Sequence, residues 1–183
     1  MKIAFSNQSL AKIAKHGVNV FPLEAYGFLL GTSEMIYAAL PVGKTSKWHD
    51  AADRFADLET ANDLAESLAG EYEMMVPAIY HSHSSDRIKE SPISNVPSMF
   101  EDKIVYISNV RGNELLFKSY AYCNNSNGEW TECEFTKLML PDITSKTNPK
   151  RIMSRWNKLW KVVDYGNNHE TELKELYGLI NKN

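Results

Sequence analysis

The sequence predicts a mixed α/β domain: a central sheet flanked by helices, with two appended C-terminal helices. Short apolar runs typical of strands alternate with segments whose apolar residues recur at helical spacing. The expected order is strand, helix, two strands, helix, strand, long loop, three strands and helix. At 183 residues, with 43% hydrophobic and 23% charged residues, the chain has the size and composition of a globular domain with a small appendage. We therefore expect a core domain over 1–140 and a helical extension over 141–183.

The first half of the chain contains five expected elements, each bounded by a capping or breaking residue. They are a strand over 1–5, a helix from Ser6 or Ser9 to about Asn19, a hairpin of one strand ending at Gly31 and one over 35–42, and a helix over 58–69 capped by Asp57. His16, within the first helix, and His169 near the C-terminus are expected at the surface.

The second half begins with an apolar strand over 75–81 and a long loop interrupted by prolines. Three further strands are expected over 103–109, 114–123 and 129–135. From Pro149 onward the apolar residues follow two helical stripes: Ile152, Trp156, Leu159, Trp160 and Val163, then Leu173, Leu176, Tyr177 and Ile180.

Two histidines, His81 and His83, lie one residue apart at the end of the strand that begins at residue 75. Residues i and i+2 of a strand point to the same side, so both imidazoles can face one point in space. Proteins build two ligands of a transition-metal site in this way. The pair alone fits a structural role equally well, with one histidine hydrogen-bonded and the other exposed.

Charge and cysteine content limit the classes of partner and compartment. Residues 146–161 carry only basic charges. We favour a solvated helix face, and the alternatives are contact with an acidic partner, with nucleic acid or with the acidic body of the same chain. Trp156 and Trp160 on this helix are expected to pack rather than to stack on bases. The chain has no apolar run of about 18 residues and its start lacks the shape of a signal peptide, so we expect a cytoplasmic protein without a membrane span. Cys123 and Cys133 flank a predicted turn and could approach across it, and reduced thiols are the favoured state.

Read together, Glu24, the His81-x-His83 pair and Ser91 resemble the JAMM/MPN metalloprotease family, in its prokaryotic branch. Glu24 stands in a Pro-x-Glu-x-x-Gly-x-Leu-x-Gly context, and seven residues separate His83 from Ser91. The resemblance covers roughly residues 1–125 and leaves out the C-terminal helices. It implies the JAMM/MPN-like, cytidine-deaminase-like version of the mixed fold.

The resemblance also implies a site and a reaction. His81 and His83 would be zinc ligands, and Glu24 would be the general acid/base that moves a proton from water to the leaving amine. Ser91 would hydrogen-bond the developing oxyanion or orient the water. The substrate would be the C-terminal tail of a ubiquitin-like or sulfur-carrier protein, bound extended beside the site by strand addition.

One position departs from the family pattern, which has a zinc-binding Asp three residues after Ser91. This chain has Ser94 there, and a neutral hydroxyl is a poor zinc ligand, so weak zinc affinity is expected. Ser94 could bind zinc directly or through water. Other substitutes, each less favoured than Ser94, are Asp86, Glu90, Asn95 and His49. The alternative function is a catalytically impaired JAMM-like module that acts as a protein-interaction scaffold, with a partner or oligomer contact through the C-terminal helices. Nucleic-acid binding by the basic segment is a weaker third candidate.

Overall fold

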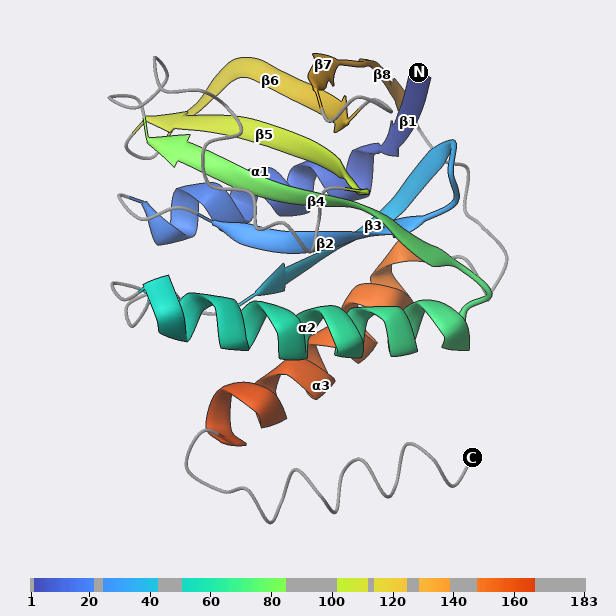
Figure 1. Cartoon of the computed structure of the whole chain (residues 1–183), viewed down its shortest axis with the longest axis vertical. Coiled ribbons are helices and arrows are strands. Elements are labelled where there is room, and N and C mark those ends of the chain that lie inside the picture. Colours follow the sequence, from blue (N-terminus) through green and yellow to red (C-terminus); the bar gives the residue numbers. More distant parts are fainter. Residues whose placement is uncertain are drawn as a thin grey trace.

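The structure is a computed structural model that describes residues 2–21, 25–42, 51–84, 102–111, 114–124, 129–138 and 148–166 (Figure 1). Within these ranges, the side chains of 51–58, 83–84, 107–111, 114–120, 124, 138 and 161–166 lie outside the description. The described chain forms a mixed α/β domain, a central mixed sheet with helices on its faces. The fold class predicted from the sequence is therefore confirmed.

The sheet contains eight strands in the order β7-β6-β5-β4-β2-β3-β1-β8. They are β1 (Lys2–Ser6), β2 (Tyr26–Gly31), β3 (Met35–Val42), β4 (Met75–Ser84), β5 (Ile104–Arg111), β6 (Glu114–Asn124), β7 (Trp130–Glu132) and β8 (Glu134–Leu138). Strand pairs β1–β3, β1–β8 and β4–β5 are parallel, and the other neighbours are antiparallel. β2 and β3 form the predicted hairpin, and β4 lies inside the sheet between β2 and β5.

The two edge strands of the sheet are consecutive in the chain. β7 pairs with β6 at one edge and β8 pairs with β1 at the other, and only Cys133 lies between them. The sheet must therefore curl until its edges meet. Three aromatic rings from β1, β5 and β8 fill the inside of the curl: Phe5 lies 4.9 Å from Tyr106 and 5.7 Å from Phe135 between ring centroids. The prediction of one strand over 129–135 is wrong, because the chain changes edge in the middle of that range.

Three helices cover the sheet: α1 (Asn7–Val20), α2 (Ala51–Glu71) and α3 (Pro149–Gly166) (Figure 1). α1 begins as predicted, because the Ser6 hydroxyl accepts a hydrogen bond from the Ser9 amide at 3.0 Å. α2 begins at Ala51, so Asp57 lies inside the helix and the predicted N-cap is wrong. A run rich in alanine precedes Asp57, and such residues extend a helix readily.

The hydrophobic core consists of two clusters, one on each face of the curled sheet. The inner cluster joins α1, through Ile13, to residues of β1, β2, β4 and β5. The outer cluster joins the opposite face to α2 and α3. α1 therefore covers the inner face of the sheet, and α2 and α3 cover the outer face. Alternate side chains of each strand point to one face or the other.

The apolar stripe of α3 packs on this outer face, as Ile152, Trp156 and Leu159 are buried in the outer cluster. The Trp156 indole also donates a hydrogen bond to the Pro41 carbonyl at 2.7 Å. Base stacking by Trp156 is thus ruled out in this arrangement, and the packing expectation is confirmed. The second predicted C-terminal helix lies outside the described residues. Among the described helices, none is long and apolar enough to cross a membrane.

We expect Trp156→Ala to lower the free energy of unfolding by about 3–5 kcal/mol, because it empties a fully buried aromatic position. Trp156→Phe keeps most of the volume but leaves the Pro41 carbonyl without its donor, at a cost of about 1–3 kcal/mol. Urea unfolding followed by circular dichroism measures both values. Lys158→Ala, an exposed position on the same helix, is the control and should change stability by less than about 0.5 kcal/mol. Equal effects of the three changes would contradict the packing of α3.

Candidate functional site

His81 lies near the C-terminal end of β4, three residues before the strand ends. Its side chain is only 3% exposed, and its ring stacks on that of Tyr26 in β2. The two ring centroids are 5.7 Å apart, with an interplanar angle of 22°. The Tyr26 ring therefore limits how the imidazole can turn, and a fixed ring presents its nitrogens in fixed directions. β4 runs on through His83, whose backbone is in register with Asn109 of β5, and the His83 side chain lies outside the description.

Ser82, the residue between the two histidines, makes a paired contact with Ala25. The Ser82 amide donates to the Ala25 carbonyl at 2.9 Å, and the Ala25 amide donates to the Ser82 hydroxyl oxygen at 2.8 Å. The side-chain oxygen thus accepts the bond that a backbone carbonyl accepts in an ordinary antiparallel ladder. Ser82 is 2% exposed and Ala25 is fully buried, so solvent does not compete for either bond. We call these two hydrogen bonds the Ala25–Ser82 clamp.

The Ala25–Ser82 clamp joins two residues that adjoin predicted site residues in the chain. Ala25 directly follows Glu24 in the chain, and Ser82 separates His81 from His83. The described chain therefore meets the middle of the His-x-His motif one residue after the predicted acid/base. Glu24, Ser91 and Ser94 themselves lie outside the described residues, as do the alternative ligands His49, Asp86, Glu90 and Asn95. Their places in the site stay predictions.

The described residues contain no group of three or more His, Cys, Asp or Glu side chains that could hold a metal ion. Of the predicted donors, only His81 has a described side chain, and the others lie outside the description. The donor types can still be judged, because imidazole nitrogens are preferred zinc ligands and a serine hydroxyl is a poor one.

A second histidine is buried on the opposite face of β4. His16 of α1 is 8% exposed, and its Nδ1 lies 2.8 Å from the Tyr80 hydroxyl oxygen. The expectation that His16 is a surface residue is wrong, because the curled sheet encloses this side of α1. Tyr80 is one residue before His81, and strand alternation turns the two side chains to opposite faces. Burial raises the pKa of Tyr80 well above its ordinary value.

Tyr80 needs the glycine opposite it. Gly27 of β2 is the register partner of Tyr80, and a Cβ placed on Gly27 would lie 2.4 Å from the Tyr80 ring. The glycine in the Pro-x-Glu-x-x-Gly context thus has a packing reason: it makes room for the aromatic ring behind the histidine strand.

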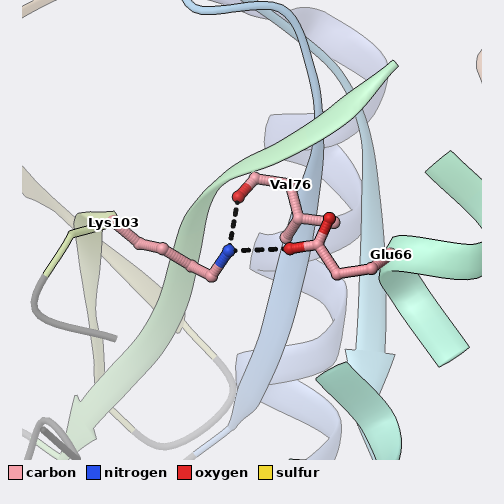
Figure 2. Close-up of polar contacts among 3 residues, drawn as sticks. All are labelled: Glu66, Val76 and Lys103. Carbon is pink, nitrogen blue, oxygen red and sulfur yellow. Dashed lines mark hydrogen bonds and ion pairs between the residues drawn. The ribbon is translucent and has the colours of Figure 1, made fainter. Parts of the chain in front are cut away.

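A pocket of about 380 Å³ lies at the other end of β4, and its lining includes Met75, Pro77 and Asp102. Figure 2 shows hydrogen bonds among three of the residues that line the pocket. The Lys103 ammonium donates to the Glu66 carboxylate at 2.8 Å and to the Val76 carbonyl at 2.9 Å. The Lys103 side chain is 11% exposed, so these bonds fasten α2 to the start of β4 and β5. Val76 is five residues before His81, roughly 16 Å along a strand, so this pocket is separate from the histidine site.

Sequence analysis missed Ser82, Tyr26 and the His16–Tyr80 pair. Ser82 carried a usable signal, because a hydroxyl within a buried apolar strand needs a hydrogen-bond partner. Tyr26 and His16 carried none, since their contacts depend on strand register and on the closure of the sheet.

Comparison with known proteins supports the fold. No protein-family profile matches the chain, and no curated protein matches it. A solution structure of a protein from Salinibacter ruber is similar at 21% identity and a TM-score of 0.54, covering 74% of this chain and 92% of that one. A solution structure of a protein from Desulfitobacterium hafniense is similar at 16% identity and a TM-score of 0.51, covering 76% and 94%. A crystal structure of a JAB1/MPN domain protein from Archaeoglobus fulgidus aligns at 18% identity and a TM-score of 0.43, covering 73% and 99%. The first two likenesses show that this arrangement of strands and helices recurs in other proteins.

We expect Ser82→Ala to lower the free energy of unfolding by about 1–3 kcal/mol, because it leaves the buried Ala25 amide without its acceptor. Hydrogen exchange of the Ala25 amide should accelerate more than that of amides in α3, which a general loss of stability would not produce. Ser82→Thr keeps the hydroxyl and should retain most of the protection. Ser154→Ala, at an exposed position, is the matched control. Unchanged exchange at Ala25 would contradict the clamp.

Tyr80 also predicts a pH dependence of stability. Its pKa is raised in the folded protein, so above its ordinary value of 10.0 the unfolded chain ionises while the folded chain does not. The free energy of unfolding contributed by Tyr80 is therefore intact below that pH and is lost as the pH rises further. The difference in unfolding free energy between wild type and Tyr80→Phe should shrink between about pH 9 and 11. Parallel profiles would contradict the buried, protonated Tyr80.

Proposed function

We propose that this chain is a JAMM-type zinc-dependent peptidase or isopeptidase that acts on the C-terminal tail of a ubiquitin-like or sulfur-carrier protein. The observation that carries the proposal is the Ala25–Ser82 clamp. A motif read from widely separated parts of the sequence gains weight when the fold brings those parts into contact. Ala25 and Ser82 are 57 residues apart in the chain, and each adjoins a residue of the proposed site.

The proposal assigns the acid/base role to the residue next to this contact, because Glu24 directly precedes Ala25 in the chain. A general base must come within hydrogen-bond distance of the water it deprotonates. We infer that Glu24 takes this proton and passes it to the leaving amine. The Ser91 hydroxyl would donate a hydrogen bond to the oxygen that becomes negative as the carbonyl is attacked.

The proposed donor set fits zinc in part. His81 and His83 offer two imidazole nitrogens, with the Tyr26 ring holding the His81 ring in place, and Ser94 offers only a hydroxyl. Bound zinc would lower the pKa of a water ligand towards neutrality and polarise the substrate carbonyl. We infer that the substitution of Ser94 for the family's aspartate weakens zinc binding, because it removes an anionic ligand. The activity would then depend on the zinc supply.

The same departure at Ser94 favours a second candidate: a JAMM-like module that does no chemistry and binds a protein partner. The apolar stripe of α3 is used inside the domain, so a partner would meet the exposed, basic side of α3. An acidic protein surface fits this charge better than a second copy of the same basic helix does. We place this candidate behind the enzyme because a pure scaffold has no need of Glu24 and the histidine pair.

Zinc content and hydrolysis, measured on the same preparations, test the proposal. We expect wild-type protein to bind zinc weakly, and Ser94→Asp to tighten binding by at least about tenfold. Glu24→Gln should retain zinc yet lose hydrolysis of a ubiquitin-like protein fused through its C-terminus to a fluorophore. Glu34→Gln, at an exposed position in the β2–β3 turn, is the matched control and should leave both properties unchanged.

The outcomes separate the two candidates. Hydrolysis that requires Glu24 and added zinc supports the enzyme. Protein that neither binds zinc nor hydrolyses the fusion, before and after Ser94→Asp, refutes the enzyme and leaves the scaffold. In that case, salt-sensitive binding of an acidic partner that is lost in Lys158→Glu would support the scaffold.

A further inference from the structure

The point at which the sheet closes contains a cysteine. Cys133 is the one residue between β7, at one edge of the sheet, and β8, at the other. It is 5% exposed and belongs to the inner hydrophobic cluster, while Cys123 of β6 is half-buried and packs against the same cluster. Both are free thiols in this structure. The proposed peptidase site uses neither of them.

Strand register places the two cysteines side by side. Cys123 is paired with Thr131 of β7, and the Cys133 amide donates to the Ala121 carbonyl at 2.7 Å. Cys133 is therefore opposite Ala121, which is two residues before Cys123 and on the same face of β6. Residues in this relation are diagonal neighbours on one face of an antiparallel pair, with Cα atoms about 7–8 Å apart and Cβ atoms somewhat closer.

The surroundings of Cys133 also lower its reactivity. Burial first, and then a hydrogen bond with the Cys123 side chain, raise the pKa of the Cys133 thiol to about 12. Cys133 is therefore a poor first nucleophile. The half-buried Cys123 is the thiol that an external reagent can reach, and Cys133 is positioned to react second. A third metal-binding side chain is absent among the described residues around the pair, which favours thiol chemistry over a metal site.

We propose that Cys123 and Cys133 form a redox modification site, which reacts with a small disulfide such as oxidised glutathione and closes into a disulfide at the point where the sheet closes. The Cys123 thiolate attacks one sulfur of the reagent, forms a mixed disulfide and releases one reduced thiol. The Cys133 sulfur, after losing its proton, attacks the Cys123 sulfur of the mixed disulfide and releases the second reduced thiol. The protein is oxidised by two electrons and the reagent is reduced by two. The two protons lost by the cysteines are taken up by the two released thiols.

The disulfide would change the molecule at one place only. It joins Cys123 of β6 to Cys133, which directly follows β7. The end of β7 is thereby fixed to β6. A disulfide that closes a loop of this length in compatible geometry stabilises a folded domain, and we expect a rise in Tm of roughly 5–10 °C.

The test starts from the full-length reduced protein incubated with oxidised glutathione, then unfolded, alkylated and weighed by mass spectrometry. We expect the wild type to lose the mass of two hydrogen atoms, to take up no alkylating agent and to yield a Cys123–Cys133 linked peptide. Cys133→Ala should stop at the mixed disulfide and gain one glutathione. Cys123→Ser, the less buried change, should react much more slowly, because only the buried thiol remains. Wild-type protein that keeps both thiols, or carries a stable glutathione on either one, would overturn the proposal.

A second measurement tests whether the folded structure favours the disulfide. The equilibrium between the dithiol and the disulfide in glutathione buffers is determined for native protein and again in concentrated urea. If the disulfide stabilises the fold, the equilibrium constant for its formation must be larger in native than in unfolded protein by the same free energy. We expect a difference of at least about tenfold. An equal or smaller constant in the native state would show that the pair is held too far apart or at the wrong angle, and would overturn the proposal even if one variant failed to fold.

Discussion

The closure of the sheet is the constraint on which the rest of this structure depends. Since β7 and β8 occupy opposite edges with one residue between them, the sheet has to curl, and its inner face must be filled. The Phe5, Tyr106 and Phe135 rings do so together with α1. The outer face is left for α2 and α3. β4 consequently lies within the sheet, between β2 and β5.

The candidate site uses this rigidity. A serine hydroxyl takes the place of a backbone acceptor in the Ala25–Ser82 clamp, which holds the chain after Glu24 against the histidine strand. The stacked Tyr26 ring fixes His81 from one side, and the His16–Tyr80 pair fills the space behind the strand. These contacts hold the end of the histidine strand. In the proposed enzyme, zinc affinity would depend on Ser94 and proton transfer on Glu24.

Local sequence predicted the elements that local forces determine. The start of α1, for which Ser6 was one of two candidate caps, and the 35–42 strand of the hairpin are confirmed. The single strand over 129–135 failed because the switch of edge is decided by pairing with β1, far away in the chain. His16 was assigned to the surface for the same reason, since only closure buries that side of α1. Glu24, Ser91 and Ser94 were predicted from a resemblance and stay predictions, because the structure describes none of the three.

The pairing of β1 with β8 has a consequence for how the protein folds. The outer edge of Lys2–Ser6 is covered only when Glu134–Leu138 pairs with it, so the first strand of the sheet finds a partner in the last one. Contacts this distant in sequence slow folding, because a long loop must be closed before they form. During synthesis the β2–β3 hairpin can form early, while β1 remains an open edge that other chains can pair with.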